Sequence, residues 1–402
     1  MKKFLALLLS AVMVLALAAC GNKTASSTPS TSAPATSSSS SSSSTTTPAD
    51  TTPAAPADAG MKVAMITDYG DITDQSFNQT TYEAAKSWSG SNGVDFTYFK
   101  PASDSDDDRV AMIEKAIDEG YNVLVMPGYA FAPAIASTVK DYPDVTFIAL
   151  DVSEYDLTSA GLDSFPANLY SAVYQEELCG YMAGYAAVKL GYNKLGFLGG
   201  MAVPAVVRYG YGFVQGVEAA AAADGKTDVS VMYAYGNLFY GVGDITAAMD
   251  TWYNDGTQVV FACGGGIFTS AGEAAAKVSG KVIGVDVDQA GIIDGQYGTG
   301  MTVTSAMKGL AATVNTLLTA VKGGTFKGGL VDTLGLVSAD PESNYVQIPM
   351  KSTQWSSTFS QDDYKALVSD MYSGKITVSN DITKNAADFA NVITVTDLGN
   401  IK

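Results

Sequence analysis

The sequence contains no histidine, and this absence narrows the chemistry open to it. Without imidazole there is no Ser–His–Asp or Cys–His catalytic arrangement and no histidine-ligated zinc. The three cysteines, Cys20, Cys179 and Cys263, are too few for a disulfide scaffold or a four-cysteine metal site. Cys179 and Cys263 lie in apolar segments, so we expect buried thiols rather than a disulfide.

Basic residues are also scarce, since Lys and Arg total 23 against 41 Asp and Glu, a formal charge of −18. This charge disfavours nonspecific attraction to nucleic acid or anionic lipid, and it favours a small or cationic partner. Hydrophobic residues make up 47% of the 402 residues, which is ordinary for a globular chain with a large core. The length predicts two or three domains.

The first 60 residues are expected to be an export signal and a tether. Residues 1–3 are Met-Lys-Lys, and the apolar run 4–19 is too short for a membrane span but typical of a signal peptide. Leu-Ala-Ala-Cys-Gly at 17–21 resembles the bacterial lipobox, which implies a signal peptide over 1–19 and a lipidated, palmitate-bearing Cys20. The alternative is a plain signal peptide with an incidental cysteine. Residues 20–60 are rich in Ser, Thr, Pro and Ala and predict a disordered tether.

From residue 61 onward, short β-branched or apolar runs alternate with amphipathic stretches. The expected strands are residues 62–67, 94–99, 122–126, 145–150, 194–198, 229–235, 258–263, 281–285 and 301–304. Apolar residues at 307, 310, 314, 317, 318 and 321 have helical spacing. The alternation predicts an α/β fold with two doubly wound parallel-sheet lobes joined by a hinge. We expect lobe 1 over about 61–165 and lobe 2 over about 166–290, with 290–402 divided between them.

Acidic residues follow three of the expected strands, at Asp68, Asp151 and Asp286. Ligands of doubly wound sheets bind beyond the carboxyl ends of the strands, so these carboxylates are candidates to receive ligand hydroxyls or amines. The alternative is that each acid caps the helix that follows. The acidic run at 104–108 lacks the glycine and distal glutamate of a calcium loop and is expected to begin a helix.

An ordered set of phrases resembles the basic membrane protein family, the PnrA-like nucleoside-binding lipoproteins of ABC importers. These phrases are Ile-Thr-Asp at 66–68, Asp-Gln-Ser-Phe-Asn-Gln at 74–79, Gly-Phe-Leu-Gly-Gly at 196–200, Gly-Tyr-Gly-Phe at 210–213, Val-Ile-Gly-Val-Asp-Val-Asp-Gln at 282–289 and Thr-Ser-Ala-Met-Lys at 304–308. The resemblance covers residues 61–402 and implies a type I periplasmic-binding-protein-like fold.

The resemblance also implies a ligand site for a purine nucleoside. Its implied contacts are Asp68, Phe77, Asn78, Asp151, Phe239, Gly264, Asp286 and Lys308. Asp68 and Asp151 would bond the base, and Phe77 would stack on it. Phe239 would form the opposite wall, with Tyr240 or Tyr235 as alternatives. Asp286, Lys308 and the glycine loop at 264–266 would hold the sugar.

One departure bears on specificity. Many relatives begin the helix after the fourth strand with a Phe-Arg-Ser-Glu-like phrase, but this chain has Tyr-Gln-Glu-Glu at 174–177 and lacks the basic side chain. A planar ligand other than a nucleoside therefore remains possible, since tyrosine both stacks and hydrogen-bonds.

The implied function is capture of inosine, guanosine or adenosine at the extracytoplasmic face of the cell membrane. The implied partners are an ABC permease and its ATPase, with the membrane reached through the lipid anchor. No cofactor, metal, catalysis or nucleic acid is expected. Two rivals remain: a binding protein that feeds a signalling receptor, and an enzyme in which clustered aspartates hold a metal for N-glycoside cleavage.

Overall fold

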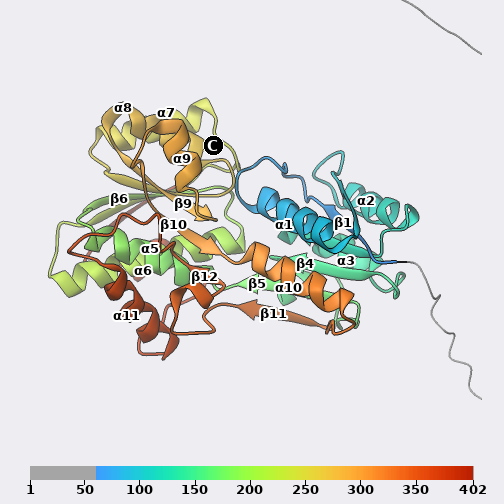
Figure 1. The fold of residues 1–402 in the computed structure, drawn as a ribbon. Coiled ribbons are helices and arrows are strands. Elements are labelled where there is room, and N and C mark those ends of the chain that lie inside the picture. The colour runs from blue at the N-terminus through green and yellow to red at the C-terminus, as the bar shows by residue number, and fades with distance from the viewer. Residues whose placement is uncertain (1–59, 402) are drawn as a thin grey trace, which may run out of the picture. The chain divides into compact units, whose positions relative to one another are not determined.

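The computed structural model describes residues 60–401, which are built around two parallel sheets (Figure 1). The expected signal peptide, Cys20 and the tether lie outside the described residues. The first sheet consists of β1 (Lys62–Ile66), β2 (Asp95–Phe99), β3 (Val123–Pro127), β4 (Thr146–Leu150), β5 (Leu169–Tyr174) and β11 (Leu330–Leu334). The second consists of β6 (Lys194–Gly199), β7 (Ser230–Tyr235), β8 (Val259–Cys263), β9 (Lys281–Asp286), β10 (Thr302–Lys308), β12 (Val346–Gln347) and β13 (Thr394–Asn400).

The strand order is β11-β5-β4-β3-β1-β2 in the first sheet and β12-β10-β9-β8-β6-β7-β13 in the second. Every pairing is parallel except that of β10 with β12. All the expected strands are present, and the α/β class with two parallel-sheet lobes is confirmed. The sequence reading missed β5, β11, β12 and β13.

The helices connect these strands as expected for βαβ units. They are α1 (Phe77–Asn92), α2 (Asp106–Asp118), α3 (Ala132–Thr138), α4 (Glu154–Ser159), α5 (Glu176–Lys189), α6 (Pro204–Asp224), α7 (Gly243–Asn254), α8 (Phe268–Val278), α9 (Ala290–Tyr297), α10 (Leu310–Lys322) and α11 (Gln361–Tyr372). The acidic run at 104–108 does begin a helix: the Ser105 side chain accepts a hydrogen bond from the Asp108 amide at the start of α2. The helical spacing from residue 310 to 321 corresponds to α10, whereas Met307 belongs to β10.

The two sheets repeat one topology. The order β2-β1-β3-β4-β5 in the first matches β7-β6-β8-β9-β10 in the second. Equivalent strands end alike: Asp151 follows β4 with φ 63°, and Asp286 ends β9 with φ 62°. Gly128 after β3 and Gly264 after β8 also have positive φ, at 126° and 148°. The carboxyl ends of both sheets therefore present similar loops.

The chain crosses between the sheets more than once. β5 pairs with β4 in the first sheet, so that sheet extends past the expected division near residue 166. β11 later returns to the first sheet, next to β5. In Figure 1, α10 lies beside α1, and the Trp88 indole donates to the Thr319 hydroxyl at 2.9 Å. The limits of the lobes remain a prediction.

Helices α5 and α6 pack with their backbones unusually close together. A Cβ at Gly212 of α6 would come within 2.1 Å of the Glu177 carbonyl oxygen, and one at Gly180 of α5 within 2.3 Å of the Tyr209 carbonyl oxygen. Only glycine fits such an approach. This contact fixes the first turn of α5 against the first turns of α6, and both turns carry charged side chains toward the cleft described below.

Candidate functional site

A cavity of about 930 Å³ lies at the carboxyl ends of the strands and receives side chains from both sheets. The ligand contacts implied by the family resemblance all line it: Asp68, Phe77, Asn78, Asp151, Phe239, Gly264, Asp286 and Lys308. Their individual roles remain predictions. Such a volume is typical of a small-molecule site.

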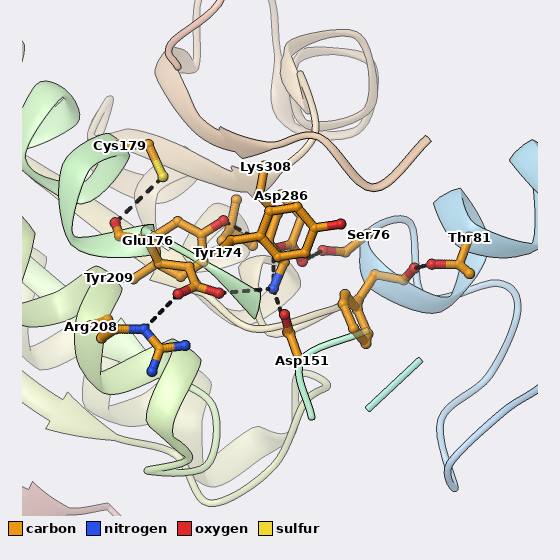
Figure 2. A network of polar contacts seen from close by, with 12 residues as sticks. Ser76, Thr81, Asp151, Tyr174, Glu176, Cys179, Arg208, Tyr209, Asp286 and Lys308 are labelled. Carbon is orange, nitrogen blue, oxygen red and sulfur yellow. Dashed lines mark hydrogen bonds and ion pairs between the residues drawn. The ribbon is translucent and has the colours of Figure 1, made fainter. Parts of the chain in front are cut away.

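Lys308, the last residue of β10, is the centre of a buried charge network (Figure 2). Its ammonium lies 2.5 Å from Asp151 Oδ2, 3.5 Å from Glu176 Oε1 and 3.7 Å from Asp286 Oδ1, and its side chain is 3% exposed. Burial disfavours the charged form, but attraction to the three carboxylates outweighs it and raises the pKa of Lys308. The lysine is therefore a cation between the two sheets.

The two equivalent strand-end acids flank this lysine, one from each sheet. Burial raises the pKa of Asp151 to about 6, although Lys308 opposes the shift. Asp151 Oδ1 is buried and has no hydrogen-bond partner. Asp286 instead accepts hydrogen bonds from the Ser76 hydroxyl at 2.5 Å and the Tyr209 hydroxyl at 3.2 Å. Asp151 thus keeps an oxygen for which residues 60–401 supply no donor.

Aromatic rings line the same cavity. The Lys308 ammonium lies 4.6 Å from the centroid of the Phe77 ring, within cation–π range. Phe239 packs into space left by two glycines: a Cβ at Gly200 would lie 2.5 Å from its ring, and one at Gly264 2.9 Å. Of the alternatives to Phe239, Tyr240 also lines the cavity, whereas Tyr235 is not among the described residues that do.

The loop after β1 supplies polar groups next to these rings. Asp68 Oδ1 accepts the amides of Tyr69 and Gly70 at 2.7 and 2.9 Å, and burial raises the pKa of this carboxyl despite both bonds. The Asn78 amide nitrogen donates to Asp74 Oδ2 at 3.2 Å, which leaves Asn78 Oδ1 buried without a partner. Because a carboxylate only accepts, Asp74 also fixes which way this amide points.

Helix capping by the strand-end acids, the alternative drawn from the sequence, is wrong for all three. The residues that flank the following helices are Ser76 before α1, Ser153 before α4 and Gln289 before α9. The acid that serves the start of α1 is Asp74, which accepts the amides of Ser76, Asn78 and Gln79.

Sequence reasoning missed four charged or polar members of the network, which are Ser76, Glu176, Arg208 and Tyr209. Glu176 is fully buried and accepts from Arg208 Nε at 2.7 Å, while the hydroxyl of Tyr209 reaches Asp286. The phrase at 174–177 has no basic side chain of its own, but Arg208 of α6 places one beside its Glu176. The sequence did offer a sign that Arg208 is important. It is the one charged residue within an otherwise apolar run at 203–214, where a charge is rare unless it is paired.

Both described cysteines, Cys179 and Cys263, are buried and unpaired, as expected. Within residues 60–401, no helix is both long and apolar enough to span a bilayer.

Two parallel-sheet lobes with a mixed aromatic and charged cavity at their strand ends define a solute-binding protein. The profile described as ABC transporter substrate-binding protein PnrA-like matches residues 61–383, and the chain belongs to this family of substrate-binding proteins rather than to an enzyme family. The nucleoside-binding protein BmpA of an ABC transporter from Lactococcus lactis is 30% identical over 295 residues, which are 69% of this chain and 79% of that protein.

Further likenesses agree with this assignment. An uncharacterized lipoprotein of Pyrococcus abyssi is 25% identical over 283 residues, covering 69% of this chain and 67% of the relative. The crystal structure of an ABC transporter solute-binding protein from Aeropyrum pernix superposes with a TM-score of 0.62 at 21% identity, over 82% of this chain and 90% of that one. The structural likeness supports the fold alone.

Proposed function

We propose that this protein is the lipid-anchored, extracytoplasmic receptor of an ABC importer, and that it captures a purine nucleoside between its lobes for delivery to a permease and its ATPase. The observation that carries the proposal is the cavity lined by Phe77, Phe239 and the Asp151–Lys308–Asp286 network. The nucleoside-binding relative in Lactococcus lactis supports the same ligand class.

The chemistry of a nucleoside fits these groups. A purine has aromatic faces, and stacking a base on an aromatic side chain contributes about 1–3 kcal/mol. Its vicinal ribose hydroxyls both donate and accept, which suits an aspartate beside a lysine. Its polar edge carries N–H donors, which suit the acceptor oxygens of Asp68 and Asn78. Inosine, guanosine and adenosine all present such donors, so each remains a candidate.

The lipid anchor is part of the proposal. Cys20 follows the lipobox-like phrase, and the Pyrococcus relative is named a lipoprotein. Mass spectrometry of the chain from membranes is expected to find a diacylglyceryl-modified Cys20 at the N-terminus. An unmodified N-terminus released into the medium would contradict the anchor without affecting the ligand.

A thermal-shift titration of the full chain tests the ligand. We expect guanosine, inosine or adenosine to raise the melting temperature, because a ligand at 100 times its dissociation constant adds about 2.7 kcal/mol of stability. Hypoxanthine and ribose, which each supply half of the contacts, are expected to shift it less. A shift with a free sugar and none with any nucleoside would overturn the proposed ligand.

A further inference from the structure

The segment before α1 bonds directly to the other sheet. The Ser76 hydroxyl donates to Asp286 Oδ2 at 2.5 Å, as Figure 2 shows, and the Gln289 side-chain amide donates to the Gln75 carbonyl at 3.0 Å. Gln75 and Ser76 follow β1 of the first sheet. Asp286 ends β9 of the second sheet, and Gln289 lies between β9 and α9. Both bonds therefore join one lobe to the other.

Ser76 does not serve its own helix. It occupies the residue before α1, where a serine side chain ordinarily accepts from the backbone, but it makes no such bond. Gln289 holds the same position before α9 and also makes no capping bond with its side chain. Both side chains are fully buried and are instead used across the cleft.

Gln75 and Gln289 are each held in position by a hydrogen bond within their own lobe. Gln75 has φ 58°, a region that non-glycine residues rarely adopt, and its amide donates to Gln79 Oε1 at 3.1 Å. Gln289 Oε1 accepts the Val285 amide at 2.8 Å, which turns its nitrogen toward Gln75. The geometry needed for the contact is therefore built into each lobe before the lobes meet.

We propose that Ser76 and Gln289 form an interlobe latch, a set of protein–protein hydrogen bonds that exist only when the lobes are closed. The latch stabilises the closed form whatever the ligand, and a ligand leaves only after the latch breaks. Asp286 then bonds to Ser76 of the facing lobe and to Tyr209 and, on the proposed function, also to a sugar hydroxyl.

The first test needs no ligand. Hydrogen–deuterium exchange of the full chain is compared between the natural protein, Ser76→Ala, Gln289→Glu and Ser89→Ala. Ser89 is an equally buried serine of α1 without a hydrogen-bond partner, which makes it a matched control. We expect Ser76→Ala to speed exchange of residues 284–292, on the opposite lobe, by about threefold or more, and Ser89→Ala to leave it unchanged.

Gln289→Glu keeps the acceptor for Val285 but replaces the donor to Gln75 with a repelling carboxylate oxygen. It is expected to speed exchange of residues 69–79 in the same way, so the latch is tested from both sides. Unchanged exchange across the cleft in both variants would overturn the latch.

The second test measures release of guanosine and rests on the proposed function. Ser76→Ala is expected to raise the dissociation rate of guanosine about fivefold, the effect of one ordinary hydrogen bond, with little change in the association rate. A loss confined to the association rate would contradict the latch. If guanosine does not bind the natural protein, the release test is made with inosine or adenosine. If none of the three binds, the proposed ligand fails and the exchange experiment alone decides the latch.

Discussion

At the scale of single residues, substitution of Phe77 tests the proposal that the cavity stacks a nucleoside base. Phe77→Ala is expected to weaken guanosine binding at least about tenfold, because a lost stack costs about 1–3 kcal/mol. Isothermal titration calorimetry measures the change. Tyr82→Ala removes another ring of α1 that packs on β2 instead, and it should leave the affinity intact. Unchanged affinity in Phe77→Ala would remove this ring from the site.

Lys308 is the cation that three buried carboxylates share, so we expect its loss to lower the stability of the fold even without ligand. Lys308→Met leaves Asp151, Glu176 and Asp286 without their shared cation, and breaking a buried ion pair from one side costs about 3–5 kcal/mol. Urea unfolding at neutral pH should show a loss of this size. Lys277→Met, which removes a half-exposed lysine paired with Asp250, should change stability by less than about 1 kcal/mol. Equal effects of the two variants would contradict the network.

Glu177 makes stability depend on pH. Burial, followed by the nearby charge of Glu176, raises the pKa of Glu177 to about 7 from its ordinary 4.5, and one of its oxygens has no partner. The native state therefore binds a proton that the unfolded state has lost, so this residue's contribution falls as pH rises from about 4.5 to about 7.

Glu177→Gln should consequently be more stable than the natural protein at pH 8, by roughly 3 kcal/mol, and indistinguishable from it near pH 4.5. Unfolding free energies measured across this range give the comparison. Glu114→Gln, which replaces an exposed carboxylate in the same way, is the matched control. A constant offset between Glu177→Gln and the natural protein at every pH would show that the proton is not involved.

At the scale of elements, the central strands were predictable because a strand that is buried on both faces consists of consecutive apolar residues. β3 and β8 are buried at every residue and were expected almost to their ends. β13 was missed because it is an edge strand with mostly exposed residues, and β11 because its residues are only half-buried. β5 was missed because the polar segment before it, which ends near residue 168, was interpreted as the boundary between the lobes.

The same reasoning explains which site residues could be predicted. Asp151 follows β4 and Asp286 ends β9, so the topology alone places each at the carboxyl edge of its own sheet. Glu176 and Arg208 meet only because α5 and α6 approach closely, and Ser76 meets Asp286 only because the lobes face one another. Strand periodicity carries no information on either arrangement.

The close packing of α5 and α6 gives a prediction of its own. Gly212→Ala would place a methyl group 2.1 Å from the Glu177 carbonyl oxygen, so the helices must separate. We expect a loss of about 1–3 kcal/mol, typical of overpacking, measured by thermal unfolding. Gly291→Ala in α9 is the control: nothing lies within 4 Å of its added methyl group, and it should stabilise the protein by about 0.5–1 kcal/mol. Equal behaviour of the two variants would contradict the close approach.

At the scale of the whole molecule, the cavity shares the acidic character of the chain. Its lining contains more acidic than basic side chains: Asp68, Asp71, Asp74, Asp104, Asp151, Asp156 and Asp286, against Lys100, Arg208 and Lys308. The three basic groups are also engaged, since Lys100 pairs with Asp71, Arg208 with Glu176 and Lys308 with Asp151. A phosphate entering between the lobes therefore meets excess negative charge.

We accordingly expect guanosine 5′-monophosphate to bind at least about tenfold more weakly than guanosine, because like charges held in a partly buried site repel strongly. Calorimetric titration of both ligands at low salt gives the ratio. The ratio of the two dissociation constants should move closer to one at about 1 M salt, where the screening length falls to about 3 Å. Guanosine itself is neutral, so its own affinity should change little and serves as the internal control. Equal affinities at low salt would mean that the phosphate escapes the carboxylates, and the closed cleft would then have to leave the 5′ position open to solvent.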